Sequence, residues 1–173
     1  VFGARLTYLQ IQNGDAYRKR SENNILKKVY LFNERGTIYD RNKKELAWNE
    51  KQDGAFPIRA YLSPGFSHVL GYVSYPNKDN AGFYWQNEFI GIDGLEKEYN
   101  NAIKGENGSK IVEINALGEV QSENIVNIPK QGNDLITSID ARIETELFTL
   151  IKNLSESNDF TGGAGIIMDI QNG

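Results

Sequence analysis

The chain has 173 residues, of which 39% are hydrophobic and 24% charged, enough for one globular domain or two small ones. Its 19 basic and 23 acidic residues are interspersed and give a net charge of −4, so the sequence offers no basic segment of the kind that nucleic-acid binding uses. The chain contains no cysteine, which excludes disulfides, thiolate metal sites and cysteine nucleophiles.

The first half of the chain is predicted to form strands and turns. Polar side chains become more frequent toward the end of residues 6–23, and this segment is predicted to begin as a helix or a strand. Residues 27–32 (KKVYLF) and 36–40 (GTIYD) are predicted as short strands, and 41–46 (RNKKEL) as a polar turn. Residues 60–77 carry no charged side chain, but two prolines and two glycines break any lipid-facing helix there, so strands and turns are expected.

The first helix is predicted over residues 94–105 (GLEKEYNNAIKG). Its apolar side chains Leu95, Tyr99 and Ile103 recur every four residues, and Gly105 supplies a stop signal.

The second half continues with strands and one longer helix. Residues 109–127 are expected to form a hairpin around the turn 115–118. Asp140 ends a strand and is a suitable N-cap for a helix over 141–154, whose apolar stripe is typical of a helix packed on a sheet. Residues 163–170 (GAGIIMDI) are predicted as a buried strand, and the fold class is α+β.

No residue pattern predicts catalysis, a cofactor or a metal. His68 is the only histidine, and no serine in a nucleophile-elbow pattern accompanies it. Asp93, Glu96 and Glu98 crowd the first turn of a predicted helix, where they oppose the helix dipole favourably. The spacings of metal-binding and phosphate-binding loops are absent.

The segment Asn33–Asn49 (NERGTIYDRNKKELAWN) is the strongest local cluster of polar side chains. Arg35, Asp40 and Arg41 suit either an active-site trio or a buried network of ion pairs. In a strand, Asp40 shares one face with Ile38. The residues alone leave both interpretations open.

Three motifs in order resemble the region that precedes the transpeptidase in class B penicillin-binding proteins. RGTIYDRNKKELAWN resembles the motif R-G-x-I-x-D-R-[NS]-G-x-x-L-A, although Lys43 stands near the position of the motif's glycine. The second motif begins at Arg59, where the segment RAYLSPGFSHVLGYV resembles R-x-Y-P-x-G followed by H-x-[LI]-G-[YF]. GIDGLEKEYN, from Gly91, resembles G-x-x-G-[LIV]-E-[KR]-x-[YF].

The resemblance implies an elongated pedestal of small antiparallel sheets with a few helices, similar to the penicillin-binding protein dimerisation domain. Such a pedestal positions a peptidoglycan D,D-transpeptidase on the periplasmic face of the bacterial inner membrane, where an N-terminal helix anchors the parent protein. The family's S-x-x-K, S-x-N and K-T-G boxes would lie beyond Gly173, so no catalytic residue is expected within this chain. The implied partners are a SEDS-family glycosyltransferase and the rod-complex scaffold protein.

The resemblance also implies a division of the chain. Residues 1–58 would form the first part of a membrane-proximal anchor, 59–133 its second part, and 134–173 the strand and helix that lead into the transpeptidase. Only nine residues separate Asn49 from Arg59, where family members carry a projecting head subdomain. The hypothesis is that this head is missing near residues 50–58, naturally or by engineering, and that the chain belongs to the elongation rather than the division subgroup.

The expected site is a structural joint rather than a catalytic centre. Two alternatives are a free-standing periplasmic adaptor and a small hydrolase with Asp40 and Glu96 as its acid pair. The joint is expected to bring together Arg35, Gly36, Asp40, Arg41, Arg59, Tyr61, Gly91, Gly94 and Glu96.

Overall fold

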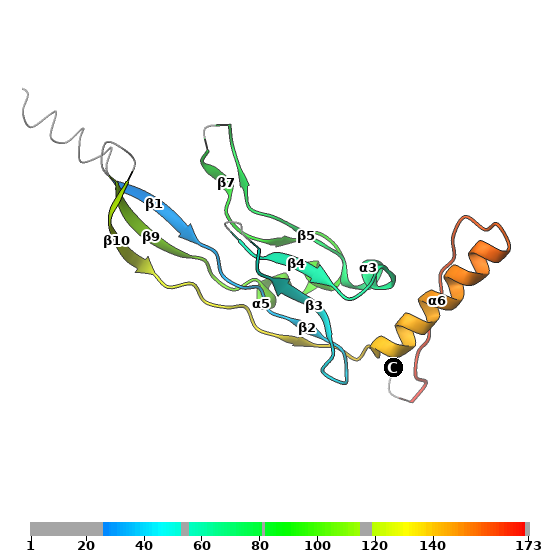
Figure 1. Cartoon of the computed structure of the whole chain (residues 1–173). Coiled ribbons are helices and arrows are strands. Elements are labelled where there is room, and N and C mark those ends of the chain that lie inside the picture. The colour runs from blue at the N-terminus through cyan, green and yellow to red at the C-terminus, as the bar shows by residue number, and fades with distance from the viewer. Residues whose placement is uncertain (1–25, 53–55, 81, 115–118, 172–173) are drawn as a thin grey trace, which may run out of the picture. The chain divides into compact units, whose positions relative to one another are not determined.

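The computed structural model describes residues 26–52, 56–80, 82–114 and 119–171. They form small sheets and a few helices, so the α+β class is confirmed (Figure 1). The chain divides into two compact units. Residues 1–32 and 107–130 belong to the first unit, and residues 33–106 and 131–173 to the second. The predicted domain boundaries at residues 58 and 133 stay a prediction.

The first unit contains a three-stranded antiparallel sheet in the order β1-β9-β10. Its strands are β1 (Leu26–Leu31), β9 (Gly108–Ile114) and β10 (Val120–Asn127), with Leu26 opposite Glu113 in the β1–β9 register. Strand β10 is an exposed edge whose pairing with β9 is interrupted by two register shifts. The predicted strand and hairpin are therefore confirmed, although the turn 115–118 lies outside the described residues.

The second unit is built on a four-stranded sheet in the order β11-β2-β3-β4. Strands β2 (Ile38–Tyr39), β3 (Glu45–Glu50) and β4 (Ile58–Tyr61) are antiparallel neighbours, and β11 (Leu135–Ile136) pairs with β2 in parallel. The turn between β2 and β3 places Lys43 at a φ of 63°, a backbone conformation that favours glycine. This conformation accounts for the glycine in the family motif.

Two short ribbons and several helical turns complete the second unit. The ribbons pair β5 (Val73–Ser74) with β8 (Ile90–Gly91) and β6 (Asn77–Lys78) with β7 (Tyr84–Gln86). The helical turns are η2 (Pro64–Phe66) and α3 (Ser67–Leu70), so part of the uncharged segment 60–77 is helical. In the described part of the chain, every helix is too short or too polar to cross a membrane.

The helix predicted over residues 94–105 is divided into two. Helix α4 (Gly94–Glu98) ends at Tyr99, whose φ of −98° and ψ of 15° leave the helical region, and α5 (Asn100–Ile103) follows. The four-residue periodicity persists across this break, which is why the sequence predicted one continuous helix.

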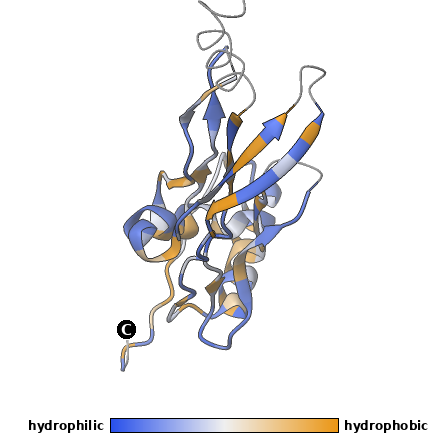
Figure 2. Cartoon of the chain, turned by 90° about the vertical axis from the view of Figure 1, so that its left-hand side faces the viewer, coloured by the Kyte–Doolittle hydropathy of each residue, from blue (hydrophilic) through white to orange (hydrophobic). Residues whose placement is uncertain are grey.

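The core of the second unit lies where the sheet meets these helical turns. Hydrophobic and hydrophilic residues are mixed along the strands (Figure 2), and in β3 the adjacent residues Leu46 and Ala47 are both completely buried. Phe66 and Leu70 enter this core from η2 and α3, and Ile103 enters it from α5. The fully buried cluster consists of Ile38, Leu46, Ala47, Phe66, Leu70, Ile103 and Ala141.

The last helix is confirmed, but its predicted surroundings are wrong. Helix α6 (Ala141–Ser157) is capped by the Asp140 side chain, which accepts from the backbone N–H of Arg142. Three residues of its apolar stripe, Ile143, Leu150 and Leu154, are 47%, 64% and 59% exposed, so this part of the stripe is not packed on a sheet.

The segment 163–170 is not a strand either. It pairs with no strand among the described residues, and Ile166 and Ile170 are each 94% exposed. A strand forms only where a neighbouring strand pairs with its backbone N–H and C=O groups. The described residues provide no such neighbouring strand for 163–170.

Candidate functional site

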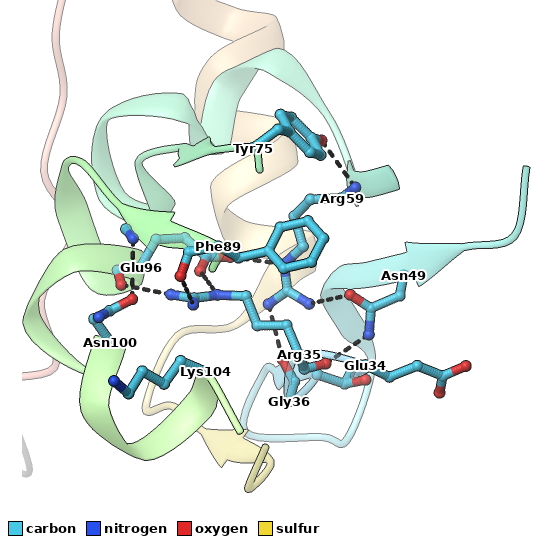
Figure 3. A network of polar contacts seen from close by, with 12 residues as sticks. Glu34, Arg35, Gly36, Asn49, Arg59, Tyr75, Phe89, Glu96, Asn100 and Lys104 are labelled. Atoms are coloured by element: carbon cyan, nitrogen blue, oxygen red, sulfur yellow. Dashed lines mark hydrogen bonds and ion pairs between the residues drawn. The ribbon is translucent and has the colours of Figure 1, made fainter. Parts of the chain in front are cut away.

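A buried glutamate between two arginines forms the centre of the second unit's polar network (Figure 3). The side chain of Glu96, on helix α4, is completely buried. Its Oε2 atom accepts from Nε of Arg35 at 2.6 Å, and its Oε1 atom accepts from Nε of Arg59 at 2.7 Å. Both arginine side chains are 1% exposed, so water does not screen these ion pairs.

Backbone carbonyls accept from both Nη atoms of Arg35. Its Nη2 atom donates to the carbonyl of Glu96 at 2.9 Å, and Nη1 points at the carbonyl of Phe89 at 3.5 Å. Burial lowers the pKa of Arg35, and the charge and hydrogen bond of Glu96 oppose that lowering. The guanidinium therefore depends on the glutamate to remain buried and charged.

Arg59 joins the sheet to the same glutamate. It lies on β4, and its Nη2 atom donates to the carbonyl of Gly36 at 2.8 Å. Its Nη1 atom donates to Oδ1 of Asn49 at 3.3 Å, while Nδ2 of Asn49 donates to the carbonyl of Arg35 at 2.5 Å. Glu96 and Asn49 are thus two separate bridges between the arginines.

Three aromatic rings pack beside the network. Phe56, Tyr75 and Phe89 have ring centroids 5.7–5.9 Å apart, in stacked and edge-on arrangements. The Tyr75 hydroxyl accepts from the backbone N–H of Arg59 at 2.9 Å, and the backbone of Phe89 faces Arg35. The aromatic cluster therefore places apolar rings next to the ion pairs and contributes acceptors to both arginines.

Glycines border the network where backbone segments approach closely. A Cβ atom at Gly36 would overlap the carbonyl of Asn133, and one at Gly91 would overlap the carbonyl of Glu96. Gly94 has a φ of 58° at the first position of α4, so a side chain there would be strained. These glycines allow close backbone approach around Glu96, strand β4 with Arg59, and the segment before β2 with Arg35.

Tyr61 contributes a buried hydroxyl that makes no hydrogen bond to any of the described residues. Burial raises the pKa of this phenol, and the charge of Glu96 raises it further. Tyr61 also packs against the hydrophobic core of the unit. Its ring belongs to the packing around the network, whereas its hydroxyl contributes no hydrogen bond to it.

Asp40 and Arg41 lie outside this network, so the expected single joint is in fact two clusters. The side chain of Asp40 is buried, but it accepts from backbone N–H groups rather than from arginines. Arg41 is exposed, and its backbone N–H donates to the carbonyl of Ile139. Both residues follow β2, and the carboxylate of Asp40 turns back onto the N–H groups of the β2–β3 turn, whereas the side chain of Arg41 is exposed.

The second cluster joins the β2–β3 turn to the start of α6. Oδ1 of Asp40 accepts from the N–H groups of Asn42 and Lys44 at 2.7 and 2.8 Å. Its Oδ2 atom accepts from the N–H of Ala141 at 3.2 Å, across 101 positions of sequence. Burial alone would raise the pKa of Asp40, but these three backbone donors and the Asn42 amide outweigh burial and hold that pKa below its usual value.

An exposed ion pair lies at the edge of the second cluster. Nδ2 of Asn42 donates to Asp140, whose carboxylate also pairs with Arg142 at 3.0 Å. The hydrogen bond from Arg142 is the main reason that the pKa of Asp140 lies well below its usual value. The Arg142 side chain is 77% exposed, so this pair is open to solvent.

Sequence reasoning missed Asn49 and Tyr75, which complete the first network. Asn49 lies opposite Arg59 in the β3–β4 register. Only this pairing shows that its amide can reach both arginines. Tyr75 is one of nine tyrosines, and no local pattern distinguishes it.

Neither cluster has the chemistry of an acid–base pair. Glu96 is fully buried and bonded to two arginines, and Asp40 accepts four hydrogen bonds. A general acid needs a raised pKa and access to substrate, whereas the pKa of Asp40 is lowered. Within the described residues, no group of three or more histidine, aspartate or glutamate side chains is placed to hold a metal ion.

Part of the chain matches a known protein family. Residues 54–137 match the model of the "Penicillin-binding Protein dimerisation domain". This span includes Arg59 and Glu96, and it begins after the segment that carries Arg35.

Curated relatives are peptidoglycan D,D-transpeptidases. The chain is 25% identical to MrdA of Escherichia coli strain K12, over 87% of this chain and 37% of the relative. It is 31% identical to the probable transpeptidase PenA of Neisseria flavescens, over 48% of this chain and 22% of the relative. The chain thus spans less than two fifths of these relatives.

Solved structures share the fold. A putative peptidoglycan glycosyltransferase from Atopobium parvulum superposes with a TM-score of 0.52 at 25% identity, over 77% of this chain and 26% of that one. The complex between penicillin-binding protein 2 and MreC from Helicobacter pylori gives 0.53 at 24% identity, over 75% and 39%. A chain from a peptidoglycan synthase complex gives 0.56 at 22% identity, over 91% and 38%.

Proposed function

We propose that this chain is the non-catalytic pedestal of a peptidoglycan D,D-transpeptidase, because residues 54–137 match the model of the penicillin-binding protein dimerisation domain. The family match is the observation that carries the proposal. The pedestal would hold the transpeptidase at the periplasmic face of the inner membrane, with the catalytic boxes encoded beyond Gly173. A downstream coding sequence with an S-x-x-K box some tens of residues on is the expected result, and its absence would favour the free-standing adaptor.

The buried network supports a structural role for the motif residues. A pedestal that positions another domain must be rigid, and Glu96 ties β4 to the segment that precedes β2. Removing one partner from a buried ion pair leaves the other charge unpaired and costs about 3–5 kcal/mol. The hydrolase alternative is disfavoured because both of its proposed carboxylates are buried and fully bonded.

We further propose that the head subdomain is missing from the β3–β4 connection. Glu50 pairs with Ile58, so only residues 51–57 connect the two strands. The MrdA alignment covers 87% of 173 residues, about 151, yet spans 233 positions, so about 82 positions hold no residue of this chain. The proposed joint, Lys51–Phe56, includes residues 53–55, which lie outside the described residues. A natural gene that encodes the same short joint would exclude an engineered deletion.

The extent of the MrdA match supports the elongation subgroup. The alignment to MrdA covers 87% of this chain, whereas the alignments to FtsI of two Buchnera aphidicola subspecies cover 48% and 58%. The implied partners are a SEDS-family glycosyltransferase and an MreC-type scaffold protein. The solved complex of penicillin-binding protein 2 with MreC from Helicobacter pylori supports the scaffold as a partner.

Scaffold binding tests the function and the missing head together. The periplasmic domain of an MreC-type scaffold is immobilised, and the affinity of this chain is compared with that of a variant carrying the MrdA head between Lys51 and Pro57. We expect this chain to bind about tenfold or more weakly than the variant, because only the anchor contacts remain. Equal affinities would refute the missing-head proposal, and no binding by either protein would refute the pedestal's role in partner binding.

A further inference from the structure

Helix α6 is held to the second unit at two points, and most of its surface is exposed. Ala141, its first residue, is completely buried in the core, whereas Ile143, Leu150 and Leu154 are at least 47% exposed. A groove of about 560 Å3 lies between α6 and the η2–α3 segment, with Val69, Leu147 and Ile151 among its lining residues. Continuous side-chain packing therefore does not fix the direction of the helix.

The first point of attachment is the carboxylate of Asp40. It accepts from the N–H of Ala141 at 3.2 Å while also accepting from two N–H groups of the β2–β3 turn. The N–H of Ala141 belongs to the first turn of α6, where backbone donors have no partner within the helix. Asp40 thus connects the first turn of α6 to the buried sheet, and its lowered pKa shows that the carboxylate is held in its charged form.

The second point of attachment is the contact between Phe148 and Gly65. A Cβ atom at Gly65 would lie 2.7 Å from Cγ and 2.8 Å from Cβ of Phe148, so the ring rests directly on the glycine backbone. Phe148 comes seven residues after Ala141, which is about two helical turns. Gly65 precedes Phe66, which is part of the buried core, so this seat is rigid.

We propose that Asp40 and Gly65 are positioning residues that together fix the direction in which α6 leaves the core. Asp40 clamps the first turn, and Gly65 seats Phe148 two turns later. Two separated points define the axis of a helix, whereas either point alone leaves it free to pivot. If the pedestal function holds, the two residues also set the direction in which the chain enters the transpeptidase.

Spin-label distances measure that direction in this chain. Because the chain has no cysteine, Lys97→Cys on α4 and Asn153→Cys on α6 provide two exposed and unique labelling sites. We expect one narrow distance distribution for the doubly labelled chain without further substitutions. Asp40→Ala and Phe148→Ala should each broaden it at least twofold, and Gly65→Val should shift its mean because the larger side chain displaces the ring.

Two matched controls should leave the distribution unchanged. Glu146→Gln removes an exposed charge from the same helix, and Gly162→Ala fills a position with nothing within 4 Å. Unchanged widths in folded Asp40→Ala and Phe148→Ala would overturn the proposal. If Asp40→Ala does not fold, Phe148→Ala and Gly65→Val decide, since Phe148 is partly exposed and outside the buried cluster.

Amide hydrogen exchange provides a second readout of the clamp. Loss of the Asp40 acceptor should speed exchange at Ala141 about tenfold, while Glu146→Gln should not change it. Unchanged exchange in folded Asp40→Ala would also contradict the clamp. The pedestal function is tested separately by scaffold binding, because binding by the unlabelled chain does not require a fixed direction of α6.

Discussion

Two carboxylates of the second unit pair with arginine, one in the buried network and one in the exposed ion pair at the edge of the second cluster. Glu96 lies between Arg35 and Arg59 with all three side chains at most 1% exposed. Asp140 pairs with Arg142, whose side chain is 77% exposed. The distances are similar, at 2.6–3.0 Å, so geometry alone would rank the two clusters as equals. Burial distinguishes them, because an unpaired charge is costly only where water cannot solvate it.

Asp40 represents a third arrangement, between those two. Its carboxylate is buried, yet its partners are backbone N–H groups rather than cations. Such a group stabilises the fold through hydrogen bonds that fix a turn and a helix end. The comparison therefore predicts three sizes of effect for three kinds of carboxylate partner.

The largest effects are expected for Arg35→Ala and Arg59→Ala. Each leaves Glu96 buried with one missing partner and should lower the free energy of unfolding by about 3–5 kcal/mol, which is roughly 6–20 °C in melting temperature. Urea and thermal unfolding of the purified chain measure this loss. Arg41→Ala is the matched control, since Arg41 is exposed in the same motif, and it should change stability by less than about 0.5 kcal/mol. Equal losses in all three variants would show that burial does not set the difference.

A smaller effect is expected for Asp40→Ala, with a distinctive dependence on pH. Loss of its hydrogen bonds should cost about 2–3 kcal/mol at pH 7. Folding lowers the pKa of Asp40, so its contribution is present above the unfolded value of about 3.9 and is lost as pH falls toward the lower folded value. Between pH 7 and pH 3, the difference in melting temperature between the unmodified chain and the variant should therefore begin to narrow below about pH 4. A constant difference across this range would contradict the role of the charge.

Tyr61→Phe should be neutral or slightly stabilising. Its buried hydroxyl has no hydrogen-bond partner among the described residues, so removal relieves a desolvation cost of up to about 1 kcal/mol while the ring keeps its core contacts. Thermal unfolding at pH 7 checks this expectation. A clear loss of stability would mean that the hydroxyl is bonded, and that the network extends further than Glu96 and the two arginines.

The smallest effect is expected for Arg142→Ala. The ion pair with Asp140 is open to solvent, where entropy and screening offset the attraction. We expect no resolved change in melting temperature at 150 mM salt. A loss comparable to that of Arg35→Ala would remove the distinction between the buried and the exposed clusters.

Sequence reasoning predicted the members of the buried network better than their grouping. The motif resemblance brought Arg35, Arg59 and Glu96 together across 61 positions, which local propensity cannot do. It wrongly added Asp40 and Arg41, because adjacency in a motif was taken as adjacency in space. The turn after β2 decides this point, since Asp40 bonds to the turn and to α6 while Arg41 faces solvent.

The exposed end of the chain shows a different limit of sequence reasoning. The apolar stripe of α6 and the run GAGIIMDI predicted a packed helix and a buried strand, yet both are exposed in the described residues. Apolar periodicity shows that a face is suited to burial, and whether it is buried depends on which partner is present. The pedestal proposal supplies such a partner in the transpeptidase that would follow.

The most direct test of the buried network is urea unfolding of Glu96→Ala beside Glu98→Ala. Both glutamates lie on α4, but Glu96 is completely buried and Glu98 is exposed. Glu96→Ala leaves two arginines buried without their carboxylate, so we predict a loss of at least about 3–5 kcal/mol, against less than about 0.5 kcal/mol for Glu98→Ala. Similar stabilities of the two variants would contradict the claim that this buried network holds the second unit together.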